Sequence, residues 1–141
     1  EQHFARVPGT VLDQITLGDP GITAEMARKA AKLAGIDDTI RSFPEGYAAP
    51  CTDEMFSQGE WQLLSIARAA AADPAVLLLD EITANLDAET EGRVLGALRR
   101  ASAGRTVLSI SHRVYEDLGG RTVEIGSLPV FSTNLNPNFV K

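Results

Sequence analysis

The sequence predicts an α/β fold in which a parallel sheet lies beside a small all-helical unit. Two apolar runs, at residues 75–79 (AVLLL) and 106–110 (TVLSI), are typical of strands buried on both faces of a parallel sheet. The residues between them carry apolar side chains at helical spacing. Strand, helix and strand over this length form a crossover unit, so we expect the two strands to run parallel.

The first part of the chain is predicted to turn before it becomes helical. Residues 1–19 have the pattern of mixed loop and short strand, with turn signals at Pro8-Gly9 and at residues 19–21 (DPG). A helix then follows. Thr23 is its expected cap, Gly35 is its expected end, and four apolar side chains recur at helical spacing: Ile22, Met26, Ala30 and Leu33.

Two further helices complete the helical unit. Ile36, Ile40 and Phe43 predict a short helix that Pro44 ends, and residues 45–55 have no period and are expected to form a surface loop. A third helix is predicted from about Gln58 to Ala72. Four side chains supply its apolar face: Trp61, Leu64, Ala67 and Ala71.

The crossover helix has clear end signals. Asp87 is its expected cap, acidic residues follow in its first turn, Arg99-Arg100 lie in its last turn, and Gly104 is its expected end. A further strand is possible at residues 121–125 (RTVEI). No element is predicted for residues 127–141, which are rich in Asn, Ser and Pro.

Length and charge exclude several classes of protein. The chain has 141 residues and a net charge of −6, with no cluster of Lys and Arg, so we expect no nucleic-acid partner. Its single cysteine, Cys51, excludes an internal disulfide. No apolar run approaches the roughly 18 residues that cross a bilayer.

Acidic residues and a histidine follow the two predicted strands. Asp80-Glu81 comes after the first strand and His112 after the second, at the sheet edge where open α/β folds bind ligands. In phosphoryl transfer an Asp at this place holds Mg²⁺, and an adjacent Glu can polarise the attacking water. The alternative is a strand that ends in solvated acids beside a structural histidine.

Residues 57–60 (SQGE) open the third predicted helix. Ser57 and Glu60 have the spacing of a capping box, which is the structural explanation of the motif. The same geometry leaves N–H groups and the positive end of the helix dipole facing a phosphate, and Gly59 would let that phosphate approach closely. Asp87 has the corresponding alternative of a simple N-cap.

The order of these motifs resembles the ATP-binding-cassette ATPase family. FSQGEWQLLSIARA (56–69) resembles the family signature and its helix, LLLDEITANLD (77–87) resembles Walker B and the D-loop, and SISHR (109–113) is similar to the switch-histidine segment. The resemblance covers residues 1–113. GTVLDQITLGDP (9–20) looks most like exporters. The resemblance to the family implies a partial P-loop NTPase core, a parallel sheet with flanking helices, beside the helical subdomain.

The resemblance implies roles for individual residues. Catalysis would involve Glu81 as general base, His112 at the γ-phosphate, and Gln2 as the Q-loop glutamine that senses Mg²⁺. Asp80 would hold Mg²⁺, together with Gln2. The signature residues would contact the ATP of the opposite subunit: Ser57, Gln58, Gly59 and Glu60. Asp87 would lie beside this site and bridge the dimer.

The implied protein is an ATPase that powers transport. Its cofactors would be ATP and Mg²⁺, and its partners a second nucleotide-binding domain, arranged head to tail, and the transmembrane domains of the transporter. It would lie at the cytoplasmic face of the membrane. The implied divisions are a Q-loop segment and link (1–19), the helical signature subdomain (20–74), the C-terminal part of the ATPase core (75–126) and a tail (127–141).

Three departures from the family pattern bear on activity. The sequence contains no G-x-x-x-x-G-K-[ST], so we expect the phosphate-gripping half to be encoded upstream and the chain alone to bind ATP weakly. Gln58 and Glu60 replace the usual Gly and Gln, and Trp61 replaces a polar residue. The segment after the histidine is short. Two alternatives therefore remain: a soluble cassette ATPase of DNA repair or translation, and a degenerate, non-hydrolysing interaction module.

Overall fold

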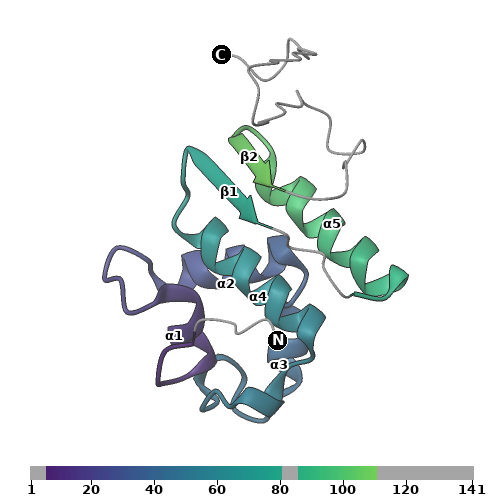
Figure 1. The fold of residues 1–141 in the computed structure, drawn as a ribbon. Helices are drawn as coiled ribbons and strands as arrows, with labels where there is room; N and C mark the ends of the chain where they lie inside the picture. The colour runs from purple at the N-terminus through teal and green to yellow at the C-terminus, as the bar shows by residue number, and fades with distance from the viewer. Residues whose placement is uncertain (1–5, 81–85, 111–141) are drawn as a thin grey trace, which may run out of the picture.

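The computed structural model describes residues 6–80 and 86–110 of the chain (Figure 1). In chain order its elements are α1 (Val11–Thr16), α2 (Ala24–Ala34), α3 (Asp37–Ser42), the 3-10 turns η1 (Gly46–Ala48) and η2 (Asp53–Met55), α4 (Gln58–Ala71), β1 (Val76–Asp80), α5 (Ala88–Ser102) and β2 (Thr106–Ile110). The predicted α/β class is confirmed. Three predicted site residues (Gln2, Glu81 and His112), the possible strand at 121–125 and the tail at 127–141 lie outside the described residues.

The predicted start and end of α2 are confirmed. The Thr23 hydroxyl accepts a 3.2 Å hydrogen bond from the Met26 amide, and Gly35 takes the left-handed conformation (φ +79°) that ends the helix. The predicted apolar face was partly wrong, because Met26 is 38% exposed. Of the other predicted positions, Ala30 is buried, and Ile22 and Leu33 pack against the core while partly buried. The buried residues of α2 are four alanines, whose small side chains suit close helix packing: Ala27, Ala30, Ala31 and Ala34.

The prediction of loop and strand for residues 1–19 was wrong in its second half, where α1 forms. Thr10 and Asp13 make a capping box: the Asp13 carboxylate accepts a 2.7 Å hydrogen bond from the Thr10 amide, and the Thr10 hydroxyl accepts from the Asp13 amide at 3.3 Å. Val11 and Ile15 are fully buried. A helix of six residues is too short to show a period, and its burial on α4 stabilises it.

The predicted surface loop at residues 45–55 is partly an interior segment. The Val11 amide donates to the Ala49 carbonyl and the Cys51 amide to the Gly9 carbonyl, each at 2.9 Å, so the loop pairs with the chain before α1. Tyr47 is 8% exposed, and its hydroxyl donates a 2.6 Å hydrogen bond to the carboxylate of Asp37, at the start of α3. Pairing and burial make this loop part of the helical core.

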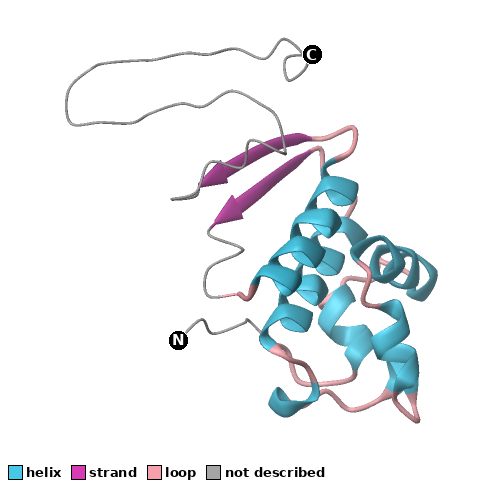
Figure 2. Ribbon diagram, turned by 90° about the vertical axis from the view of Figure 1, so that its right-hand side faces the viewer, coloured by secondary structure: helices cyan, strands magenta, loops and turns pink. Residues whose placement is uncertain are grey.

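Helix α4 is the centre of the molecule and contacts α1, α2 and α5 (Figures 1 and 2). Its predicted inner face is confirmed by side chains that are between 0% and 6% exposed: Trp61, Leu64, Ala67 and Ala71. Among the described helices, none combines the length and the apolar character that crossing a membrane requires.

Strands β1 and β2 pair in parallel, as predicted, with Val76 opposite Thr106 and Asp80 opposite Ile110. The expectation that both faces of β1 are buried was wrong for the described residues: Leu77 is 5% exposed but Leu78 is 73% exposed. Figure 2 shows the reason, because the described helices lie on one side of the two strands. Leu108, opposite Leu78 in the register, extends the exposed apolar face.

Candidate functional site

Asp80 ends β1, and its backbone pairs in register with Ile110 at the end of β2. The two parallel strands therefore finish at one edge of the sheet, as predicted. Asp80 is exposed at this edge. Its predicted neighbours Glu81 and His112 lie outside the described residues.

The described residues offer no metal site made of protein ligands alone. Within residues 6–80 and 86–110, no group of three or more His, Cys, Asp or Glu side chains is placed to hold a metal ion. Asp80 belongs to no such group among these residues. Mg²⁺ usually keeps several waters and binds one or two carboxylates together with substrate phosphates, so the exposed Asp80 at this edge fits that ion.

Ser57 and Glu60 form the capping box that their spacing predicts. The Ser57 amide donates a 2.9 Å hydrogen bond to Glu60 Oε2, and the Ser57 hydroxyl accepts a 3.3 Å bond from the Glu60 amide. The Ser57 hydroxyl also donates to Glu60 Oε2 at 2.9 Å. The hydroxyl thus has a donor and an acceptor partner within the cap.

The Glu60 carboxylate is turned back towards the chain by these contacts. Its second oxygen, Oε1, accepts a 3.4 Å hydrogen bond from the Thr39 hydroxyl of α3. The side chain is partly buried, whereas Ser57 and Gln58 are exposed. The first turn of α4 therefore presents a serine and a glutamine to solvent, with a carboxylate folded behind them.

Trp61, which stands where the family pattern has a polar residue, belongs to an aromatic stack with Phe56 and Phe43. Its ring meets that of Phe56 edge to face, with centroids 5.2 Å apart, and Phe56 meets Phe43 in the same way at 5.4 Å. The indole N–H donates a 3.3 Å hydrogen bond to the Asp53 carbonyl. This stack anchors the residue before the cap to the end of α3.

Gly59 is buried where α4 meets the first turn of α5. A Cβ on Gly59 would overlap the Cγ2 methyl group of Thr90 and lie 3.6 Å from the Thr90 Cβ. The missing side chain therefore allows the N-terminal turns of α4 and α5 to touch. The sequence suggested close phosphate approach as the reason for this glycine, and the helix contact is a second reason that the sequence did not indicate.

Asp87 caps α5, as predicted. Its Oδ1 accepts hydrogen bonds from the amides of Glu89 and Thr90, at 3.1 and 3.0 Å. The pKa of the Asp87 carboxyl is lowered from its ordinary value of 3.8, first by a hydrogen bond from the Thr90 side chain and then by the Thr90 amide. Asp87 therefore remains an exposed anion near the Gly59 contact.

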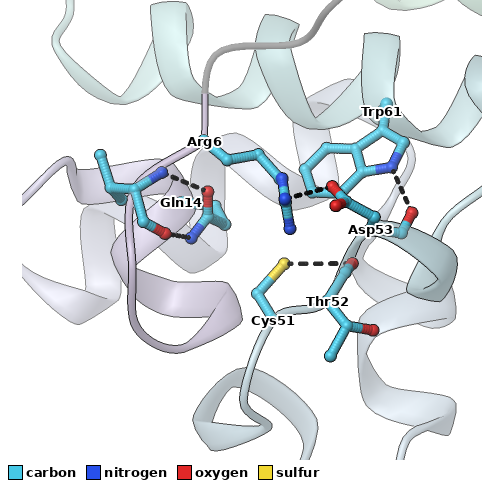
Figure 3. A network of polar contacts seen from close by, with 7 residues as sticks. Arg6, Gln14, Cys51, Thr52, Asp53 and Trp61 are labelled. Carbon is cyan, nitrogen blue, oxygen red and sulfur yellow. Dashed lines mark hydrogen bonds and ion pairs between the residues drawn. The ribbon is translucent and has the colours of Figure 1, made fainter.

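The segment that follows Gln2 is tied to the loop before α4 (Figure 3). The Gln14 side chain bonds both backbone groups of Val7, accepting from its amide at 3.2 Å and donating to its carbonyl at 2.6 Å. Arg6 forms an ion pair with Asp53, whose carbonyl accepts from Trp61. These contacts connect the chain after Gln2 to the α4 cap through Asp53 and Trp61.

Two residues of this network were missed by the sequence analysis. Gln14 is fully buried, and its backbone carbonyl accepts a 2.7 Å hydrogen bond from the Arg68 guanidinium of α4. Burial lowers the pKa of the Arg68 guanidinium. Both residues are polar at positions that face inward, and the only signal in the sequence is their helical spacing from apolar residues that are also buried.

Comparison with known proteins agrees with this arrangement. A family model described as "ABC transporter" matches residues 2–84. The chain is 44% identical over 136 residues to the mycobactin import ATP-binding/permease protein IrtA of Mycolicibacterium smegmatis, covering 89% of the chain and 16% of that protein. It is 41% identical over 128 residues to the multidrug resistance protein pgp-1 of Caenorhabditis elegans, covering 83% of the chain and 10% of that protein.

A solved structure gives the same result. A bacterial Atm1-family ABC exporter with ATP bound matches 77% of the chain and 19% of its own length, with a TM-score of 0.63 and 35% identity. The chain thus spans less than a fifth of the length of each of these relatives. The family match agrees with the motifs at the end of β1 and at the N-termini of α4 and α5. The chain belongs to the ATP-binding-cassette (ABC) transporter family.

Proposed function

We propose that this chain is part of the ATP-binding and ATP-hydrolysing domain of an exporter-like ABC transporter, and that it powers transport across a membrane. The observation that carries the proposal is the meeting of two helix N-termini, those of α4 and α5, through Gly59 and Thr90. This contact holds the signature residues 57–60 beside Asp87. The dipole of each helix favours negative charge at its N-terminal end, where the Glu60 amide donates to Ser57 and the Glu89 and Thr90 amides donate to Asp87.

The residues present fit ATP and Mg²⁺ in part. Ser57 and Gln58 are exposed at the first turn of α4, where a phosphate would bind, and Asp80 is an oxygen donor of the kind Mg²⁺ prefers. When bound, ATP supplies the phosphoryl group whose transfer releases the free energy for transport. The sequence contains no G-x-x-x-x-G-K-[ST], and we propose that the 141-residue chain alone binds ATP weakly.

The chain's own residues would then have distinct tasks. Glu81 would accept a proton from the attacking water, His112 would contact the γ-phosphate, and Gln2 would sense Mg²⁺. Asp87 would bridge to the second nucleotide-binding domain. The partners would be that domain and transmembrane domains, at the cytoplasmic face of the membrane.

The test is Mg-ATP turnover by the complete polypeptide that contains this chain. Glu81→Gln should lower turnover at least about a hundredfold, the low end of what a general base contributes. Glu54→Gln, the same change at an exposed acid of η2, is the matched control and should leave turnover unchanged. Equal turnover in the wild type and in Glu81→Gln would refute the assignment of Glu81 as the base.

A second candidate function, a non-hydrolysing interaction module, is favoured by one observation. The Ser57 hydroxyl donates a hydrogen bond to the Glu60 carboxylate and accepts one from the Glu60 amide. A phosphate that binds Ser57 would have to displace the carboxylate from this hydroxyl. A module of this kind would bind ATP with no turnover in either the wild type or the Glu81→Gln variant. Turnover in the wild type excludes it.

A further inference from the structure

Thr90 contacts both helix caps of the candidate site, the α4 cap through its methyl group and the α5 cap through its amide. Its Cγ2 methyl group occupies the place of the side chain that Gly59 lacks, so it packs directly on the first turn of α4. Its amide donates a 3.0 Å hydrogen bond to Asp87, and its side chain is the largest cause of the lowered pKa of that carboxyl. One threonine therefore connects the signature residues with Asp87.

The contact is close enough to fix a spacing. A Cβ on Gly59 would overlap the Thr90 methyl group, while the next nearest atoms, Thr90 Cβ and Oγ1, would lie at 3.6 and 3.9 Å, which are ordinary contacts. Among the described residues, the obstruction at position 59 is therefore one methyl group. A β-branched side chain in a helix has few rotamers, so this methyl group has little freedom to move aside.

We propose that Thr90 is a positioning residue that sets the distance between the α4 cap, with Ser57 and Gly59, and the α5 cap at Asp87. The inference rests on the proposed function, since the two caps must act on one nucleotide and one partner domain. A change in their spacing alters the placement of the groups that meet the phosphate. In enzymes a misplacement of about 1 Å can lower the rate about a hundredfold.

The proposal makes a specific claim about why residue 59 is glycine. If a phosphate alone required the glycine, Gly59→Ala would be harmful whatever residue occupies position 90. If the Thr90 methyl group requires it, the harm disappears when that methyl group is removed. Thr90→Ser removes Cγ2 and keeps the hydroxyl, whereas Thr90→Val keeps Cγ2 and removes the hydroxyl, so these two changes are a matched pair.

The experiment measures Mg-ATP turnover and melting temperature in the complete polypeptide. Gly59→Ala should lower turnover roughly a hundredfold and lower the melting temperature. Gly59→Ala with Thr90→Ser should return turnover to within about threefold of Thr90→Ser alone, because the two sites are coupled. Gly59→Ala with Thr90→Val should stay as impaired as Gly59→Ala. Gly92→Ala is the control, because a Cβ on this glycine of α5 would meet no atom of the described residues within 4 Å; it should lower neither turnover nor the melting temperature.

Two outcomes overturn the proposal. In the first, the Gly59→Ala variant is as inactive with Thr90→Ser as without it, which would mean that the phosphate alone requires glycine at position 59. The other is Gly59→Ala that melts and turns over like the wild type. Should Gly59→Ala fail to fold, recovery of folding with Thr90→Ser and not with Thr90→Val supports the proposal, and failure in both overturns it.

The failure of this proposal differs from the failure of the proposed function. A wild-type protein that folds but never hydrolyses ATP refutes the ATPase assignment. The melting temperatures of the same variants then still decide whether the Thr90 methyl group sets the spacing of the two caps. Conversely, normal wild-type turnover without rescue by Thr90→Ser leaves the ATPase assignment in place and removes only the role of Thr90.

Discussion

The Ser57 amide donates a 2.9 Å hydrogen bond to Glu60 Oε2, and the Glu60 amide returns a 3.3 Å bond to the Ser57 hydroxyl. This reciprocal pair shapes the first turn of α4 and explains how a carboxylate is tolerated beside a predicted phosphate site. The charge is turned into the cap, where it accepts hydrogen bonds from the backbone N–H group and the hydroxyl of Ser57.

Replacing Glu60 with Gln should strengthen ATP binding. The amide oxygen of Gln can still accept from the Ser57 amide, so the cap persists, but the negative charge near the phosphates is removed. We expect the KM for ATP to fall by about two- to tenfold in the complete polypeptide, as expected for about 0.4–1.4 kcal/mol of relieved repulsion. Steady-state kinetics measure this directly.

Glu54→Gln is the control for the Glu60 variant, because it removes the same charge from exposed residue 54 in the neighbouring turn η2. It should leave KM nearly unchanged, because the side chain of Glu54 is exposed and solvent and salt screen its charge, whereas the Glu60 carboxylate is held in the α4 cap. Equal effects of the two variants would show that net charge, and not the α4 cap, controls the affinity for ATP.

Loss of the Tyr47 hydroxyl should destabilise the helical core. Its 2.6 Å hydrogen bond to Asp37 is buried, and Tyr47→Phe leaves that carboxylate without this donor. We expect a loss of about 1–3 kcal/mol in the free energy of unfolding at pH 8, measured by urea denaturation. Ser42→Ala removes an exposed hydroxyl of α3 and should cost less than about 0.5 kcal/mol.

The same variant should reveal a pH dependence in the alkaline range. Burial, and then the hydrogen bond to Asp37, raise the pKa of Tyr47 above its ordinary value of 10.0. A raised pKa in the folded state means that this contribution is complete below pH 10 and is lost as the pH rises towards the folded-state pKa. The stability difference between wild type and Tyr47→Phe should therefore shrink above pH 10. A constant difference up to pH 12 would contradict the raised pKa.

Adjacent leucines of β1 should respond in opposite ways in the 141-residue chain. Leu78 is 73% exposed, so Leu78→Ser should reduce self-association and leave the melting temperature nearly unchanged. Leu77 is 5% exposed, so Leu77→Ser should lower the free energy of unfolding by about 2–5 kcal/mol. Light scattering and circular dichroism measure the two effects. Equal destabilisation by both substitutions would show that Leu78 is packed in an interior.

Much of the fold could be predicted because the residues at the helix ends are local signals in the sequence. Thr23, Ser57 and Asp87 each cap the helix that the sequence assigned to them, and the strands at residues 76–80 and 106–110 pair in parallel as expected. Capping depends on hydrogen bonds within three residues, so a pattern in the sequence contains the required information.

Features that depend on distant partners could not be predicted. Helix α1 has a capping box from Thr10 to Asp13, a signal that was present, but six residues show no period and its stability comes from packing on α4. The edge-to-face contact of Trp61 with Phe56 and the methyl contact of Thr90 with Gly59 join separate segments. Only tertiary structure brings such residues together.

The most direct test of the central claim is ATP-driven association of the complete nucleotide-binding domain. If the signature residues 57–60 contact ATP held by a second domain, Glu81→Gln should stop hydrolysis and trap a dimer with Mg-ATP, and adding Ser57→Arg should return it to a monomer. Analytical ultracentrifugation distinguishes the two states. A folded Glu81→Gln protein that binds Mg-ATP and stays monomeric at every concentration tested would contradict the account.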